Sequence, residues 1–170
     1  RSKSEFEERQ GATKAISEEE QYGVSFGGPI KRDVAHFFVA YEAKSYQSPT
    51  TFNLGRGYGI SQLPADFQSE FGSGVFTKPF DEDLYFAKLD LTAGMDHYFE
   101  LTTKVRKESE TTDIGGNRMP SASTDNINEE TRADLRWQWT GQDWLNDAHI
   151  GYEKSFWSPQ PHEFSNGYWL

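Results

Sequence analysis

Histidines are the first residues in this sequence that could bind a metal or carry protons. There are four of them, His36, His97, His149 and His162. None belongs to an H-x-x-x-H pair, which would place two imidazoles on one face of a helix, and the chain has no cysteine to supply a thiolate. We therefore interpret the histidines as ordinary polar residues and expect no metal site built on them.

Two acidic segments could bind calcium, because carboxylate and amide oxygens are the ligands that this ion prefers. They are Asp81-Glu82-Asp83 and the run from Asp125 to Glu129. Neither has the glycine and the closing glutamate that a calcium-binding helix–loop–helix motif needs. We interpret both segments as solvated loops, with a calcium site as the alternative.

Catalytic arrangements are harder to find than candidate ligands. Carboxylates are abundant, but nothing singles out the pair that a glycosidase would use. The glycine-rich run Gly55–Gly59 follows no strand–helix pattern, so it does not predict a phosphate-binding loop. We expect no enzyme, no catalytic residue and no cofactor.

Composition indicates a chain that folds but does not bind nucleic acid. Its 170 residues carry a net charge of −10, from 17 basic and 27 acidic side chains, whereas nucleic-acid binding needs a basic face. Apolar residues make up only 35%, yet aromatic residues reach 15%, and a disordered chain would be poor in aromatics. No run approaches the roughly 18 apolar residues of a membrane-spanning helix.

Polar and apolar residues alternate over long stretches, which is the pattern of β-strands. In the first such stretch Tyr22, Val24 and Phe26 are in phase. Residues 1–20 have few large apolar side chains and are expected to form a loop or a frayed strand. The alternation predicts six strands: Gln21–Ile30, Val34–Ser45, Asp83–Thr92, His97–Glu108, Thr131–Thr140 and Leu145–Phe156.

The connections between these strands are alternately short and long. Short turns are expected at 31–33, 93–96 and 141–143, and long irregular segments at 46–80 and 109–130. The strands are about 10–12 residues long, whereas soluble strands average roughly 5–6. Long hairpins with short turns at one end and long loops at the other are typical of outer-membrane barrels.

The charges opposite each stripe indicate what the two faces of the sheet meet. In the fifth strand Leu135 and Trp137 share one face, and Arg132 and Arg136 the other. If the register of this strand shifted by one residue, both arginine side chains would point into the lipid. Each arginine near the membrane midplane would then cost about 2–4 kcal/mol of stability. We therefore predict that the apolar stripes face lipid and the charges face a wet interior.

The predicted fold class is all-β, an antiparallel up-and-down segment of a transmembrane β-barrel made of three long hairpins. Six strands are too few to close a membrane barrel, and an open sheet edge in lipid leaves backbone groups unpaired. We therefore expect residues 1–170, which begin at Arg1, to be part of a larger barrel.

Two segments resemble a known family. The first comprises Gln21-Tyr22-Gly23, the turn GGPIKRD at residues 27–33 and the strand FFVAYE at residues 37–42. It resembles an early barrel hairpin of TonB-dependent outer-membrane receptors, most closely of their Oar-like branch. The second segment, EDLYFAKLD at residues 82–90, looks like the next hairpin of that family. The later strands are similar in architecture alone.

The resemblance implies a protein of the bacterial outer membrane, with a plug domain inside a 22-stranded barrel. Such receptors take up scarce nutrients, for example a siderophore, oligosaccharide, vitamin or peptide, and the TonB energy-coupling complex drives the uptake. The implied partners of residues 1–170 are outer-membrane lipid, the plug domain and the rest of the barrel, that coupling complex, and a small-molecule or oligomeric nutrient. We see no plug-like region in this sequence.

Two groups of residues are candidates for ligand binding. The long segment 46–80 would lie outside the cell and offers the aromatic residues Phe52, Tyr58, Phe67, Phe71 and Phe76, of which Phe52, Tyr58, Phe71 and Phe76 are the candidate ligand contacts. The inner face of the fifth strand offers Arg132, Asp134 and Arg136, beside Lys104 and Arg106 of the fourth. Two alternatives stay open: the long loop packs against neighbouring loops, and the charges pair with one another.

Two other functions fit parts of the pattern. A soluble β-sandwich that binds carbohydrate would bury the apolar stripes against a second sheet. A structural or adhesive outer-membrane barrel would span the membrane without transport. The long strands and the strict order of short and long connections favour the receptor over the sandwich.

Overall fold

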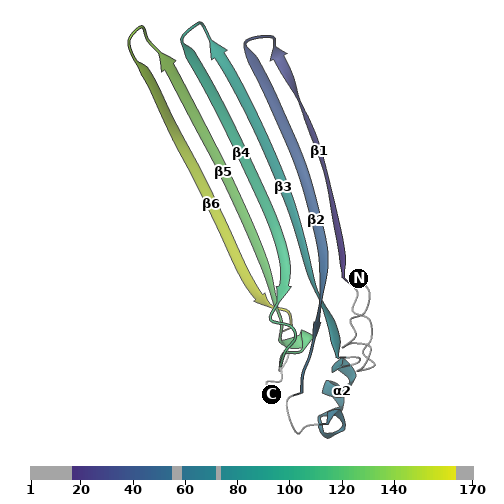
Figure 1. Cartoon of the computed structure of the whole chain (residues 1–170). Coiled ribbons are helices and arrows are strands. Elements are labelled where there is room, and N and C mark those ends of the chain that lie inside the picture. The colour runs from purple at the N-terminus through teal and green to yellow at the C-terminus, as the bar shows by residue number, and fades with distance from the viewer. Residues whose placement is uncertain (1–16, 55–58, 72–73, 164–170) are drawn as a thin grey trace.

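The computed structural model describes residues 17–54, 59–71 and 74–163, and these form one antiparallel sheet in which each strand pairs with the next along the chain (Figure 1). The fold is therefore all-β and up-and-down, as predicted. The strands are β1 (Glu18–Lys31), β2 (Ala35–Thr51), β3 (Val75–Ala93), β4 (His97–Thr112), β5 (Thr124–Thr140) and β6 (Leu145–Pro161). Within the described chain β1 and β6 do not pair with each other, so the sheet is not closed.

The three short turns lie where the sequence predicted them, between β1 and β2, β3 and β4, and β5 and β6. Asp33 and Gly94 adopt positive φ angles of 60° and 68° in the first two turns. Glycine takes this backbone conformation at no steric cost, and aspartate tolerates it. These turns gather at one end of the sheet and the long connections at the other (Figure 1).

The strands extend further toward the long connections than predicted. The prediction of irregular structure is therefore wrong for much of residues 46–80 and 109–130. Tyr46–Thr51 of β2 pairs residue by residue with Val75–Phe80 of β3, and the rings of Tyr46 and Phe80 stack at 4.6 Å between centroids. Thr124–Glu130 likewise belongs to β5. Polar and apolar residues alternate poorly in these segments, so their own sequence does not predict a strand. They form strands because a neighbouring strand provides backbone hydrogen-bond partners.

The remaining part of each long connection also contains regular turns. The β2–β3 connection holds a 3₁₀ turn, η1 (Ile60–Gln62), and a short helix, α2 (Ala65–Phe71). The β4–β5 connection holds a second 3₁₀ turn, η2 (Pro120–Ala122). The sequence predicted irregular structure for both connections, because neither of these segments is long enough to show a helical period.

The register places the predicted stripes together on one side of the sheet, which we call the apolar face. One row across the centre runs Phe37–Leu89–Leu101–Leu135–Ile150. The opposite side, the polar face, carries rows such as His36–Asp90–Glu100–Arg136–His149. Because side chains alternate along every strand, this register assigns each residue to one face.

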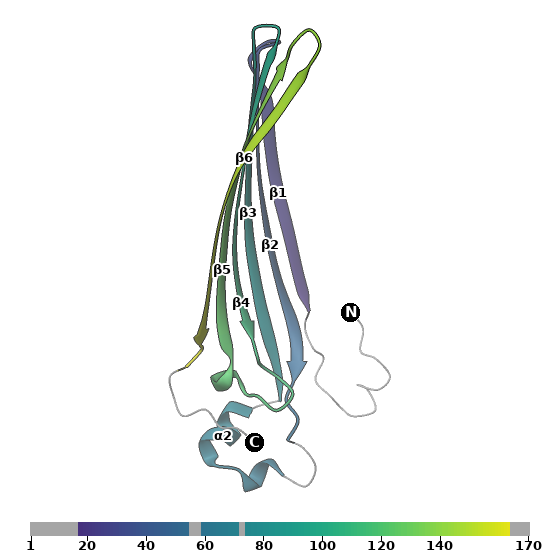
Figure 2. The ribbon, with the colours of Figure 1, turned by 90° about the vertical axis from the view of Figure 1, so that its left-hand side faces the viewer.

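The apolar face is not covered by any other part of the described chain. Val24 and Phe26 are each 67% exposed and Ile150 is 74% exposed. Seen edge-on, the strands form a single curved layer (Figure 2). A sandwich would cover this face with a second sheet, so within the described residues the structure lacks the burial that the sandwich alternative requires.

Burial is concentrated instead where the two long connections meet, below the sheet in Figure 1. We call residues 52–54, 59–71, 74–76 and 113–123 the loop cluster. Its core consists of Phe52, Phe67 and Met119, which are 6%, 2% and 1% exposed. Residues packed around this core are Leu54, Leu63, Phe71 and Phe76.

Candidate functional site

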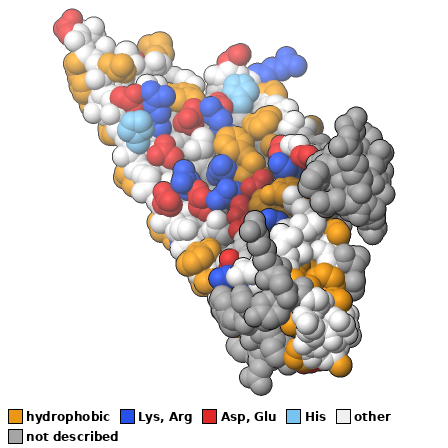
Figure 3. All heavy atoms as spheres, turned by 60° about the horizontal axis from the view of Figure 1, so that its bottom comes forward, with side chains coloured by type: hydrophobic (Ala, Val, Ile, Leu, Met, Phe, Trp, Pro, Cys, Tyr) orange, Lys and Arg blue, Asp and Glu red, His pale blue; other side chains and the backbone are white. Residues whose placement is uncertain are grey.

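The polar face is the part of the described chain with the densest set of charged side chains. Figure 3 shows basic and acidic groups gathered over its middle. Because successive residues of a strand point to opposite faces, every second residue of β3, β4 and β5 adds a side chain to this surface. Most of the charges are held in ion pairs between neighbouring strands.

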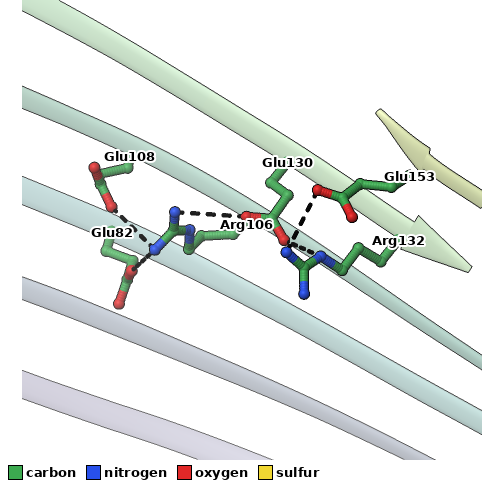
Figure 4. Close-up of polar contacts among 6 residues, drawn as sticks. All are labelled: Glu82, Arg106, Glu108, Glu130, Arg132 and Glu153. Carbon is green, nitrogen blue, oxygen red and sulfur yellow. Dashed lines mark hydrogen bonds and ion pairs between the residues drawn. The ribbon is translucent and has the colours of Figure 1, made fainter. Parts of the chain in front are cut away.

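Arg106 on β4 is the centre of the largest group of ion pairs (Figure 4). Its guanidinium lies 3.8 Å from Glu82, 3.5 Å from Glu108 and 3.6 Å from Glu130. Glu130 also pairs with Arg132, which in turn lies 3.4 Å from Glu153 on β6. Four carboxylates thus surround two guanidinium groups and tie β3, β4, β5 and β6 together.

Smaller pairs occupy the end of the polar face near the short turns. Arg136 donates two hydrogen bonds to Asp147, at 2.9 Å from Nε and 2.5 Å from Nη2. Lys88 lies 2.8 Å from Glu100, and His36 lies 3.1 Å from Asp90. The two-pronged geometry of the arginine pair fixes the relative position of β5 and β6 as well as adding attraction.

The three predicted ligand-binding residues of the fifth strand, now β5, differ in whether they form ion pairs. Arg132 and Arg136 are engaged in the ion pairs described above. Asp134 makes no hydrogen bond or ion pair with any residue that the structure describes, and the same holds for Lys104 on β4. Both side chains border a shallow hollow beside Phe86 and Gly151.

The hollow depends on two residues that sequence analysis did not select. Phe86 is an aromatic residue at a polar position of β3, and Gly151 has no side chain beside Asp134 on β6. Each breaks the local alternation, which is the signal that could have identified them. A Cβ atom at Gly151 would lie 3.5 Å from Oδ2 of Asp134, so the glycine leaves that carboxylate open.

The predicted aromatic ligand residues lie in the loop cluster. The ring of Phe52 packs edge-on against Phe67 and Phe71, at 5.7 Å and 5.8 Å between centroids. Phe71 and Phe76 border the same core, and Tyr58 lies outside the described residues. The geometry thus gives these phenylalanines packing partners within the two connections, in line with the alternative that the loops pack on each other.

Polar contacts join the two connections across the loop cluster. The carboxylate of Glu70 on α2 accepts hydrogen bonds from the backbone N–H and the hydroxyl of Ser121, at 2.7 Å and 2.9 Å. The backbone N–H of Asn53 donates to the carbonyl of Gly116 at 2.6 Å. No local pattern in the sequence signals these contacts, because their partners are distant along the chain.

Replacing Glu70 by alanine is expected to loosen residues 113–123 from α2, at a cost of about 1–3 kcal/mol for the unsatisfied partners. Hydrogen exchange should show lower protection of the Ser121 amide. Glu70→Gln is the matched control, because its carbonyl oxygen keeps one acceptor for Ser121. Equal protection in Glu70→Ala and the unsubstituted protein would contradict the contribution of this contact.

The acidic segments interpreted as loops lie in strands, and that interpretation is wrong. Asp81–Asp83 belongs to β3 and Asp125–Glu129 to β5, so neighbouring carboxylates point to opposite faces. Asp125 accepts a hydrogen bond from the hydroxyl of Thr111 at 2.8 Å and lies 2.8 Å from Nδ1 of His162. Among the described residues, no group of three or more metal-ligating side chains could hold a metal ion.

The pairing with His162 makes Asp125 sensitive to acid. Partial burial raises the pKa of Asp125, but the hydrogen bonds from His162 and Thr111 lower it, and its net pKa is below the ordinary value. A carboxyl group with a depressed pKa adds stability above its unfolded pKa of about 3.9, and this stability is lost as pH falls through the folded pKa. Since both side chains are almost half exposed, the effect is local and modest.

We expect acidification from about pH 5 to about pH 2 to loosen the end of β6. The amide of His162, which donates to the carbonyl of Ser123 at 3.0 Å, should lose exchange protection over that range. Asp125→Asn should remove most of this pH dependence, because asparagine does not titrate. A protection factor that changes equally in both proteins would contradict the assignment.

One short run has the spacing of a catalytic motif that sequence analysis overlooked. Gly23–Gly27 reads G-x-S-x-G, the motif of a serine nucleophile on a sharp strand-to-helix turn. In the structure this run lies within the regular pairing of β1, and Ser25 is opposite Ala40. The turn is absent there, and no histidine faces the serine across the strands.

Aromatic side chains form a group at each border of the apolar face. Near the short turns Trp137 and Trp139 lie almost parallel, at 6.3 Å between centroids, and Trp144 packs edge-on against Trp139 at 4.3 Å. Toward the long connections Tyr41 contacts Tyr22 and Tyr85, at 6.3 Å and 5.1 Å. Between these two borders the exposed side chains are mainly aliphatic, among them Val39, Leu89, Leu101, Leu135 and Ile150.

Comparison of the chain with family models, curated proteins and solved structures finds no match. Among the described residues, no helix has the length and apolar character needed to cross a membrane. The candidate sites therefore rest on their geometry: a charged polar face on which Lys104 and Asp134 have no partner among the described residues, and an exposed apolar face with aromatic borders.

Proposed function

We propose that these strands form part of the wall of a TonB-dependent receptor of the Oar-like type in the bacterial outer membrane. The observation that carries the proposal is the exposed apolar face bordered by aromatic residues. Its stripes on β2, β3, β4 and β5 cover residues 35–43, 85–93, 97–105 and 131–139. A tilted strand needs about 9–11 residues to span a bilayer, which these stripes provide.

The two aromatic borders support this orientation. Tyrosine and tryptophan favour the boundary between hydrocarbon and water, and outer-membrane barrels carry such girdles on both sides. Here Trp137, Trp139 and Trp144 lie near the short turns, and Tyr22, Tyr41 and Tyr85 lie toward the long connections. Short turns would then face the periplasm and the loop cluster the exterior.

The two open edges of the sheet are part of the proposal. Each of β1 and β6 pairs with one neighbour only within the described chain, and unpaired backbone groups are not viable in lipid. We assign the missing pairing to further strands of the same barrel. The polar face then lines the interior, where a plug domain and a nutrient would meet the charges of β4 and β5.

The experiment that tests the proposal is extraction of the native protein from its source. We expect the protein in the outer-membrane fraction, soluble only with detergent, with a mass several-fold above 19.5 kDa. Energy-dependent nutrient uptake that stops when the coupling complex is removed would distinguish a receptor from an adhesive barrel. Recovery near 19.5 kDa from the soluble fraction would overturn the membrane assignment.

A further inference from the structure

Among the described residues, the middle of the polar face contains a cation and an anion that are both unpaired and lie next to each other, Lys104 and Asp134. Between the row of Asp90 and the row of Glu82, the described charges other than Lys104 and Asp134 have an ion-pair or hydrogen-bond partner. Both β4 and β5 have neighbours on each side, so the free state of Lys104 and Asp134 is not due to a sheet edge.

The register explains why Lys104 has no partner within the described part of the chain. It lies between Phe86 on β3 and Arg132 on β5, so its direct cross-strand neighbours are an apolar ring and a like charge. The guanidinium group of Arg132 forms ion pairs with Glu130 and Glu153. Asp134 in turn lies between Thr102 and Gly151, neither of which carries a charge.

The two free groups are diagonal neighbours across β4 and β5. Lys104 faces Arg132 and Asp134 faces Thr102, which are two residues along the same face. Such neighbours are about 7–8 Å apart. The two charged groups form no ion pair with each other, so a small molecule with an acid and an amine on one carbon can pair with both of them through charge-assisted hydrogen bonds of about 2.8 Å.

We propose that this hollow binds an α-amino acid with an apolar side chain. The carboxylate of the ligand accepts a hydrogen bond from Nζ of Lys104, and its ammonium group donates to Asp134. The α-carbon lies between these two groups, Gly151 keeps the hollow open on the far side of Asp134, and the ring of Phe86 beside Lys104 packs against the ligand side chain. The inference rests on the proposed function, since it names the substrate class for the inner face of that barrel.

Phenylalanine binding to the purified native protein in detergent tests the proposal directly. Equilibrium dialysis would compare L-phenylalanine with phenethylamine, which lacks the carboxylate, and with 3-phenylpropionate, which lacks the ammonium group. We expect each analogue to bind about tenfold more weakly or worse, because it leaves one charged group of the site unpaired. Phenylalanine that binds no more tightly than both analogues would overturn the proposal.

Substitutions in the hollow test which residue binds the carboxylate of the ligand and which binds its ammonium group. Lys104→Gln should make phenylalanine and phenethylamine bind equally, and Asp134→Asn should do the same for phenylalanine and 3-phenylpropionate. Gly151→Val should block all three ligands without removing a charge. Lys154→Gln on the apolar side of β6 is the matched control and should leave binding unchanged.

The outcomes separate this inference from the proposed function. A protein recovered from the outer membrane that shows no preference for the zwitterion would overturn the amino-acid site and leave the receptor assignment in place. Loss of stability without ligand in Lys104→Gln and Asp134→Asn, with no effect on phenylalanine binding, would assign both groups to another part of the polypeptide and also overturn the site.

Discussion

Leu135→Arg is expected to prevent assembly of the native protein into the outer membrane. Leu135 lies in the central row of the apolar face, between Leu101 and Ile150, and is 44% exposed. In the proposed wall it meets the hydrocarbon near the midplane, where an arginine costs about 2–4 kcal/mol. The free energy of unfolding, measured in lipid vesicles, should decrease by that amount. The fraction of the protein recovered from the outer membrane should decrease as well.

The matched control places the same charge three residues away on the other face. Gln138 lies on the polar face and already donates a hydrogen bond to Asp147 at 3.1 Å. Gln138→Arg should be tolerated, because an arginine there meets water and a carboxylate. Equal tolerance of both substitutions, or equal loss, would contradict the assignment of the two faces.

Phe67→Ala has the second large expected effect, which is confined to the loop cluster. Phe67 is 2% exposed and packs against Phe52 beside Met119. Removing a buried phenylalanine side chain costs about 3–5 kcal/mol, because apolar burial is lost and a cavity remains. Since the sheet contributes little to this core, we expect the loop cluster to open locally while the strands stay paired.

Hydrogen exchange and limited proteolysis would measure that opening. Protection should fall for residues 59–71 and 113–123 and persist in the central parts of β3, β4 and β5. Phe156→Ala is the control, because Phe156 is 51% exposed and distant from the core in the register. Protection of the loop cluster that survives Phe67→Ala would show that the strand ends hold the two connections without this core.

The sequence alone determined the parts of the strands near the short turns, their faces and the short turns themselves. Side-chain direction alternates with every residue of a strand, so the in-phase run of Tyr22, Val24 and Phe26 is a local signal that needs no knowledge of the partner. The same reasoning placed Leu135 and Arg136 on opposite faces, and the register agrees. A one-residue error in any strand would have mixed the two faces, which the clear polarity of the stripes prevents.

Only the tertiary structure decided the features that depend on partners far apart in the chain. The ends of β2 and β3 extend as strands because Tyr46 meets Phe80, and the core of the loop cluster exists because Phe52 and Phe67 meet Met119. The register also distinguishes Arg132, which forms ion pairs with two glutamates, from Asp134, which has no partner among the described residues. Alternation is a property of each strand by itself, whereas ion pairs and packing depend on which side chains the register brings within a few ångströms of one another.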